Sequence, residues 1–282
     1  MLLNLQAPTP LEYFATLVQS DQGFPLLEVA LSLAQDEYPQ LDLQHTLALL
    51  DALQMRLQKR CGRQTSMLER IHLLNRLFYG ELGFGVNAND YYDPDNSFVH
   101  LVLQTRRGIP ISLGVLWLEL ARSIGLEAHG VAFPGHFMLK VLLSQGQVVL
   151  DPLTGRSFSS EELTVQLQNL LPRLSHLNEE SVPLAMFLQS ASPRETIARM
   201  LRNLKEIYRL QQDLPRLLAV QNRLVILLPQ AWNEVRDRGW VHVDLHHTEA
   251  ALADFQSYLE HVPQPLDAED VRAQIQQLRT GI

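Results

Sequence analysis

The 282-residue chain has only one cysteine, Cys61. A single thiol can support neither an intrachain disulfide framework nor a cysteine-based metal cluster, and this scarcity favours a reducing compartment. The chain also lacks the run of about 18 apolar residues that a membrane-spanning helix needs, and its N-terminus lacks the basic and apolar segments of a signal peptide. These absences predict a cytoplasmic protein without a membrane span.

Basic residues are also in the minority. The 23 Lys and Arg residues against 31 Asp and Glu residues give a net charge of −8. Binding to phosphates needs a clustered basic surface, so we expect no nucleic-acid partner. Hydrophobic residues make up 46% of the chain, which at this length suits one large or two modest domains with a packed core.

Apolar residues recur every three or four positions through much of the first 80 residues. The pattern is clearest in two segments, formed by Leu43, Leu47, Leu50, Leu53 and Leu57 and then by Met67, Ile71, Leu74 and Phe78. This spacing places the apolar side chains on one face of a helix, so each segment predicts an amphipathic helix.

A long loop is predicted to follow these helices. Residues 80–96 (GELGFGVNANDYYDPDN) are rich in Gly, Asn, Asp and aromatic residues, and long loops in compact domains are often functional. Asn96 is positioned to cap a short helix that runs through Leu103. A second helix is predicted from Ser112 to Ile124, with a glycine directly after it.

Three short apolar segments come next, at residues 128–133, 137–143 and 148–150. The polar turn SQGQ separates the last two, so the segments predict a small antiparallel sheet. Helix signals return at Ser160 and continue to the end of the chain. The fold class is therefore α+β, mostly helical, with a small antiparallel sheet.

The last third of the chain contains an internal repeat. Pro229 and Pro263 are 34 residues apart, and each follows an apolar helical segment. Ala251, Phe255 and Pro263 fall where a tetratricopeptide repeat has a small residue, an aromatic residue and a proline, whereas the first copy is degenerate. This pattern predicts a C-terminal module of paired helices.

Three short motifs carry residues with catalytic chemistry. GIPISLG, PGHF and LDP contain Ser112, His136 and Asp151 respectively. A hydroxyl at a helix N-terminus faces the positive end of the helix dipole, where anionic charge is favoured. An imidazole can accept its proton, and a carboxylate can fix the imidazole tautomer. Together the three residues predict an activated nucleophile in a cleft.

Each of these residues also has a structural interpretation. Ser112 alone is typical of a helix cap, His136 of a hydrogen-bonded histidine in a sheet, and Asp151 of a turn residue. The hairpin raises a further question of distance. A turn centred between residues 145 and 146 would place Asp151 opposite Lys140 and leave His136 about 13 Å along the strand, so a bulge or a longer loop would be needed.

The order of nucleophile, histidine and aspartate resembles that of the transglutaminase-like superfamily, a circularly rearranged relative of papain-type folds. Residues 96–155 are similar to the core of that superfamily. With the C-terminal helices, nearly the whole chain resembles the bacterial SirB-type branch, in which GIPISL and PGHF are characteristic. The resemblance implies a helical N-terminal part plus transglutaminase-like core over residues 1–175 and a tetratricopeptide-like domain over residues 176–282.

The chain departs from the superfamily at the nucleophile, because Ser112 stands where transglutaminases have cysteine. A serine hydroxyl is a far weaker nucleophile than a thiolate. We therefore expect a non-catalytic or weakly active module that binds a peptide or protein, and the resemblance to SirB-type proteins implies a regulatory role. The alternative is a serine-dependent amide or ester hydrolase, or an acyltransferase, that uses Ser112, His136 and Asp151.

Polar residues of the long loop are candidates for lining the cleft. They are Asn89, Tyr91, Tyr92 and Asn96. A Tyr or Asn side chain can donate to an oxyanion, but it can equally anchor the loop.

We expect no metal and no cofactor. Asp93 and Asp95 lack the glycine and the distal glutamate of a calcium loop. His242, His246 and His247 lack the cysteines or the carboxylate spacing of a zinc site.

Overall fold

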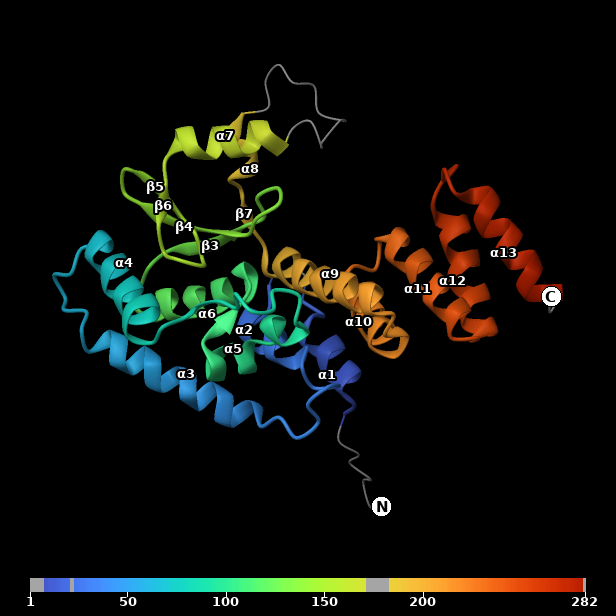
Figure 1. The fold of residues 1–282 in the computed structure, drawn as a ribbon, viewed down its shortest axis with the longest axis horizontal. Coiled ribbons are helices and arrows are strands. Elements are labelled where there is room, and N and C mark those ends of the chain that lie inside the picture. Colours follow the sequence, from blue (N-terminus) through green and yellow to red (C-terminus); the bar gives the residue numbers. More distant parts are fainter. Residues whose placement is uncertain (1–7, 21–22, 171–182, 281–282) are drawn as a thin grey trace. The chain divides into compact units, whose positions relative to one another are not determined.

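The computed structural model describes residues 8–20, 23–170 and 183–280 (Figure 1). The chain forms two compact units. One unit spans residues 20–200, and the other combines the N-terminal segment up to residue 19 with residues 201–282. The division into residues 1–175 and 176–282 that the sequence suggested stays a prediction.

Helices make up most of the larger unit. They are α2 (Leu26–Ser32), α3 (Leu43–Gln58), α4 (Met67–Asn75), the π-helix η1 (Arg76–Glu81), the 3-10 helix η2 (Pro94–Ser97), α5 (Val99–Thr105), α6 (Pro110–Ser123), α7 (Ser160–Leu170) and α8 (Leu184–Phe187). The two amphipathic helices predicted from the leucine-rich spacing are α3 and α4. Each turns its apolar face inward, and Leu50, Leu57 and Leu74 are 2% exposed or less.

A five-stranded antiparallel sheet lies in the same unit, with strand order β6-β5-β4-β3-β7. Its strands are β3 (Ala128–Val131), β4 (Met138–Leu143), β5 (Gly146–Leu150), β6 (Ser157–Phe158) and β7 (Ser190–Ala191). The three apolar segments of the sequence form its centre, because near-continuous apolar runs suit strands that are covered on both faces. Two more short strands, β1 (Gly85–Val86) and β2 (Arg107–Gly108), pair in parallel and hold the long loop.

Helix α6 covers one face of the sheet, and α7 and α8 lie on the other side (Figure 1). Helix α6 is buried along most of its length, which fits its apolar sequence. Close packing there depends on two glycines. A Cβ atom would lie 2.7 Å from the Phe137 ring at Gly114 and 2.4 Å from it at Gly130. On the opposite face, Met138 and Leu163 belong to a cluster of buried apolar residues.

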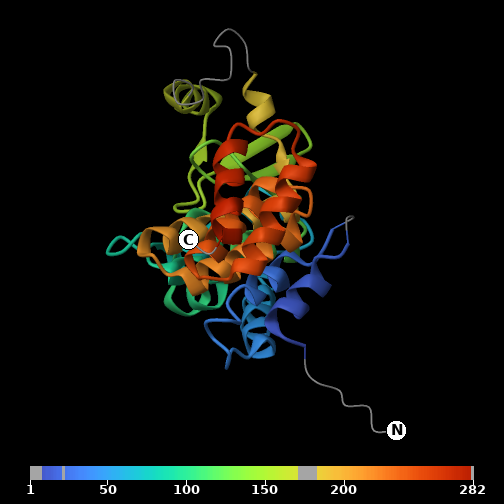
Figure 2. The same cartoon turned by 90° about the vertical axis from the view of Figure 1, so that its right-hand side faces the viewer.

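The second unit is helical. Its elements are α1 (Pro10–Leu17), α10 (Leu214–Leu227), α11 (Trp232–Asp244), α12 (Thr248–His261), α13 (Ala268–Thr280) and the end of α9 (Pro193–Gln211), which continues from the first unit. Figures 1 and 2 show α11, α12 and α13 side by side in orange to red. Phe255 is fully buried between them, as the repeat pattern predicts, and so is Ala251, whereas Leu252, also expected to be buried, is only partly so. A Cβ at Gly239 would lie 2.7 Å from the Phe255 ring, so this glycine lets α11 and α12 approach closely.

Helix α1 packs against α10 within this unit, and the Arg223 guanidinium lies 5.7 Å from the centre of the Phe14 ring. A capping box formed by Thr9 and Glu12 begins α1. Within the described ranges, no helix has both the length and the apolar character needed to cross a lipid bilayer.

Candidate functional site

Ser112 lies in the first turn of α6, but it is not the N-cap. The helix begins at Pro110, which is favoured at the first helical position, and Ile109 is the N-cap. Ser112 is therefore the third helical residue. Its Oγ accepts a hydrogen bond from the backbone N–H of Ile109 at 3.1 Å. The side chain thus satisfies one of the backbone N–H groups at the start of the helix.

The same hydroxyl also donates a hydrogen bond. Ser112 Oγ donates to the carbonyl oxygen of Asn96 at 2.6 Å and lies 3.1 Å from the carbonyl oxygen of Ile109. Ser112 is 0% exposed, and among the described residues it forms no hydrogen bond with His136. The hydroxyl joins η2 to the start of α6, and in this conformation it is closed to solvent.

His136 and Asp151 do come together. His136 Nε2 lies 3.3 Å from Asp151 Oδ1. The hairpin achieves this with a turn centred one residue earlier than the sequence suggested, between residues 144 and 145. Leu139 pairs with Leu150. Asp151 therefore lies one residue beyond that pair, on the side of His136, and not opposite Lys140. This shift of two residues corrects the predicted register and brings Asp151 toward His136.

The Asp151 carboxylate accepts further hydrogen bonds. Leu153 N–H donates to its Oδ1 at 3.0 Å, and the Thr154 hydroxyl donates to its Oδ2 at 2.9 Å. Burial raises the pKa of Asp151, but these bonds and the one to His136 outweigh it and hold the pKa below its ordinary value. Asp151 is therefore a carboxylate near neutral pH, and it can fix the orientation of the imidazole.

The loop that follows Asp151 is held by residues that sequence analysis missed. Asn75 Nδ2 donates to the carbonyl oxygen of Gly155 at 3.0 Å, and Asn75 Oδ1 accepts from Trp117 Nε1 at 2.9 Å. The Tyr79 hydroxyl donates to the carbonyl oxygen of Pro152 at 3.0 Å. Burial and the charge of Asp151 raise the pKa of Tyr79, so its hydroxyl stays protonated.

Gly155 makes this arrangement possible. Its φ is +73°, and a Cβ there would lie 2.4 Å from the Tyr79 ring. Asn75 ends α4 and Tyr79 lies in η1, a π-helical segment of the kind that is frequent at functional sites. The glycine after LDPLT was the one sequence signal for this contact.

A pocket of about 390 Å³ opens beside His136. The residues that line it are Pro134, Gly135, His136, Phe158, Gln166, Asn169 and Leu170. They come from the loop before β4, from β6 and from α7, on the side of the sheet opposite α6. The side chain of His136 is 29% exposed, so the imidazole is accessible although Ser112 is not.

The loop residues predicted to line the cleft differ in exposure. Asn96 is 3% exposed, and its amide donates to the carbonyl oxygen of Asp90 at 2.6 Å. It lies in η2, whereas Phe98 is the N-cap of α5, so the predicted capping role of Asn96 was wrong. Tyr91 and Tyr92 are 48% and 65% exposed, and Asn89 is exposed as well. Their binding role stays a prediction.

No group of three or more His, Cys, Asp or Glu residues in the described ranges is arranged to hold a metal ion. The Asp93 side chain accepts from Asp95 N–H at the start of η2, and Asp95 accepts from the Tyr38 hydroxyl. His242 and His247 contact each other through their Nδ1 atoms at 3.2 Å. All four side chains thus have partners within the protein.

Comparisons with known proteins agree with this architecture. A family profile described as the transglutaminase-like superfamily matches residues 44–202, and a tetratricopeptide repeat profile matches residues 204–276. A UPF0162 protein of Xylella fastidiosa is 33% identical over 256 residues, 90% of each chain. Protein SirB1 of Salmonella typhimurium is 29% identical over 220 residues, 77% of this chain and 79% of the relative.

Among solved structures, the crystal structure of menin aligns over 95% of this chain and 74% of menin with 11% identity. Its TM-score of 0.39 is too low to carry an argument. The two profiles and the curated relatives confirm both the resemblance and the fold class that the sequence predicted. The chain therefore belongs to the transglutaminase-like superfamily, in the family that includes SirB1 and the UPF0162 proteins, with C-terminal tetratricopeptide repeats.

Proposed function

We propose that this chain is a non-catalytic or weakly active binding protein with a regulatory role. Its transglutaminase-like core binds a peptide or protein segment in the pocket beside His136. The observation that carries the proposal is the state of Ser112, whose buried hydroxyl donates to Asn96 and accepts from Ile109. Attack on a carbonyl would require this hydroxyl to give up both bonds, each of which contributes to stability.

The pocket beside His136 has the chemistry of a peptide-binding site. Phe158 offers an apolar surface, and Gln166 and Asn169 carry amides that can pair with peptide groups. His136 stays accessible while Asp151 holds its ring. Ligand pockets combine mostly apolar walls with a few placed polar groups in this manner. The tetratricopeptide helices supply a second surface of a type that binds protein partners.

Peptide selection on the full chain tests the binding role. Peptides obtained by phage display would be measured by isothermal titration against the wild type, His136→Ala and His129→Ala. His129 is a matched control because it is similarly exposed, at 37% of its side chain, and does not line the pocket. We expect His136→Ala to weaken binding at least about tenfold, or 1.4 kcal/mol, and His129→Ala to leave it unchanged. Equal loss in both variants would contradict the proposal.

A serine-reactive fluorophosphonate probe tests the catalytic alternative. The buried hydroxyl predicts no labelling of the wild type at Ser112. Labelling that disappears in Ser112→Ala, together with amide or ester hydrolysis lost in the same variant, would establish the serine enzyme instead. The pairing of His136 with Asp151 is the observation that keeps this alternative in view.

A cysteine at position 112 gives a second, independent measure of access. Ser112→Cys would be made together with Cys61→Ser, so that the new thiol is the only one. Burial predicts that this thiol reacts with iodoacetamide at neutral pH more slowly than native Cys61, which is partly exposed. Fast alkylation that falls when His136 is changed to Ala would show a competent nucleophile position.

A further inference from the structure

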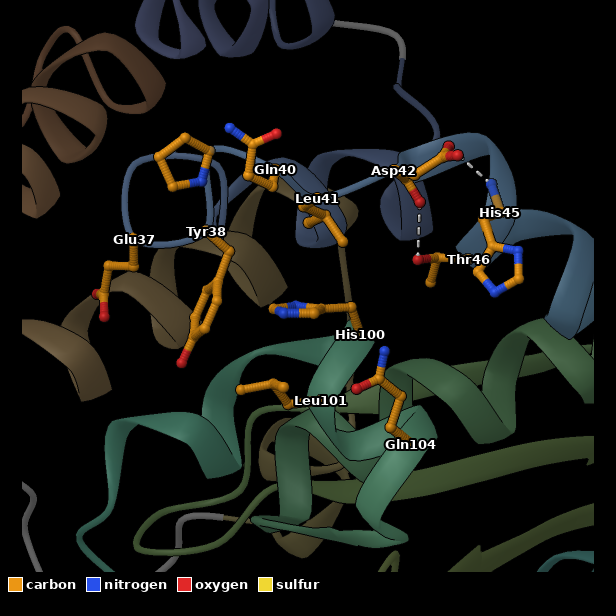
Figure 3. Close-up of a pocket in the computed structure, with 11 residues that line it drawn as sticks. Glu37, Tyr38, Gln40, Leu41, Asp42, His45, Thr46, His100, Leu101 and Gln104 are labelled. Atoms are coloured by element: carbon orange, nitrogen blue, oxygen red, sulfur yellow. Dashed lines mark hydrogen bonds between the residues drawn. The ribbon is translucent and has the colours of Figure 1, made fainter.

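A second pocket lies away from the His136 site, between α5 and the segment that connects α2 to α3. Its volume is about 570 Å³, within the range of small-molecule sites. The walls are formed by three parts of the chain: Glu37, Tyr38, Pro39, Gln40, Leu41 and Asp42 from the connecting segment, His45 and Thr46 from the first turn of α3, and His100, Leu101 and Gln104 from α5. Figure 3 shows His100 and the Gln104 amide directed from α5 toward this segment.

His100 is a buried residue whose ring nitrogens form no hydrogen bond with a described residue. It is 4% exposed, and its Nδ1 is fully enclosed without a hydrogen-bond partner. Its Nε2 has no hydrogen bond with a described residue either, but it is not fully enclosed and reaches the surface of the pocket. Buried polar side chains in proteins are nearly always paired. Nδ1 is enclosed, so Nε2, in the wall of the pocket, is the ring nitrogen that a ligand group can pair with.

The environment fixes the form of this imidazole. Burial lowers the pKa of His100, although the charge of Asp95 opposes the shift in part. The ring is therefore neutral at pH 7, with one N–H donor and one acceptor. An unpaired buried donor is rarer in proteins than an unpaired acceptor. We therefore assign the proton to Nε2, so that His100 presents an N–H donor to the pocket.

The wall around His100 is braced. The Tyr38 ring meets the His100 ring edge to face, with 4.8 Å between ring centres. The Tyr38 hydroxyl donates to Asp95 Oδ1 at 2.5 Å. On the far wall, Asp42 caps α3 by accepting from His45 N–H at 2.9 Å. These bonds hold both walls apart without using His100 Nε2 or the Gln104 amide.

The charge of the lining selects against anions. Glu37 and Asp42 carry carboxylates, and no Lys or Arg lines the pocket. An anionic ligand would meet repulsion without a compensating cation. A cationic ligand without an acceptor would leave the His100 N–H unpaired. Leu41 and Leu101 supply an apolar surface for a ring or chain.

We propose that this pocket binds an uncharged small molecule that has an apolar ring or chain and a carbonyl acceptor. The carbonyl oxygen accepts from His100 Nε2–H, and the Gln104 amide pairs with the same polar group. The apolar part packs against Leu41, Leu101 and the Tyr38 ring. This binding is separate from the His136 site and does not depend on it.

The test uses benzamide as the probe and two matched analogues. Benzoate has the same shape with a negative charge, and benzylamine has a positive charge and no acceptor. Binding to the full chain would be followed by two-dimensional NMR titration. We expect benzamide to bind in the millimolar range, as suits a fragment of its size, and both analogues to bind at least tenfold more weakly. Binding of either analogue as tight as that of benzamide would overturn the proposed chemistry.

Three variants locate the site. Leu101→Trp fills the pocket and should abolish benzamide binding, whereas Leu49→Trp, at a leucine of α3 that is 41% exposed and outside the pocket, should leave it unchanged. His100→Phe keeps a ring but removes the N–H, and it should weaken binding about fivefold or more. Circular dichroism melts would confirm that each variant is folded. Unchanged binding in Leu101→Trp, or no benzamide binding by the wild type, would refute the proposal.

Discussion

Replacing Ser112 with alanine should cost stability rather than activity. The hydroxyl donates to Asn96 O at 2.6 Å and accepts from Ile109 N–H at 3.1 Å, in a position that solvent does not reach. Without it, these two backbone groups keep only a mutual contact, from Ile109 N to Asn96 O at 3.3 Å. Each of the two hydrogen bonds that are lost contributes about 0.5–1.5 kcal/mol net. We therefore expect Ser112→Ala to lower the free energy of unfolding by about 1–3 kcal/mol.

Ser97, the last residue of η2 and directly before the N-cap of α5, offers a matched control. It is 2% exposed, and its hydroxyl is buried with no partner among the described residues. Ser97→Ala should therefore leave stability unchanged or raise it slightly, since no hydrogen bond is lost.

Urea unfolding measures both variants. Trp117 in α6 reports on the larger unit if Trp232 and Trp240, the only other tryptophans, are changed to Phe. The expected result is a lower midpoint for Ser112→Ala with an unchanged slope, and no shift for Ser97→Ala. Substitutions of ordinary surface residues change the free energy of unfolding by about 0.5 kcal/mol or less. If the free energy of unfolding of Ser112→Ala differs from that of the wild type by no more than this, the structural role of the hydroxyl is refuted.

Three further changes follow from the same contacts. Asp151→Asn removes a carboxylate whose pKa lies below its ordinary value of about 4. The stability that this carboxylate adds is present above that pH and is lost as the pH falls further. In thermal melts from pH 7 to pH 3, we expect the variant to be less stable than the wild type at pH 7 and to lose less stability in acid. A wild-type slope in the variant would contradict this. Gly155→Ala should cost about 1–3 kcal/mol, because φ is +73° and the new Cβ would meet the Tyr79 ring. Gly146→Ala, with φ +136° and open space around it, should cost less in the same urea assay. Glu234→Gln removes a carboxylate that is 6% exposed and pairs with both Arg202 and Lys205 of α9. We expect this change to lower the thermal midpoint of the helical unit. An unchanged midpoint would show that the pairing adds no stability.

The hairpin shows how far the sequence pattern reaches. The apolar segments and the polar turn between them predicted the two strands and their antiparallel pairing correctly. It could not separate the predicted register from the observed one, because the two differ by two residues and both keep the same side chains on the same face. The observed register pairs Leu139 with Leu150. Only this choice brings Asp151 to His136, and the contacts of Tyr79 and Asn75 with the following loop support it.

Ser112 shows a different limit. The sequence predicted its place in the first turn of a helix, and the proline two residues earlier could have indicated that the helix starts at Pro110. It could not predict where the hydroxyl points. That depends on the carbonyl of Asn96, which the long loop brings from 16 residues away.

The sequence by itself determined the superfamily, the α+β class and the helical repeat, because these follow from local periodicity and residue order. Tertiary structure decided the register of the hairpin, the burial of Ser112 and the pockets beside His136 and His100. These features depend on contacts between segments far apart in the chain, such as Tyr38 with Asp95 and Trp117 with Asn75. Local propensity cannot predict such contacts, since they form only when the elements pack against one another.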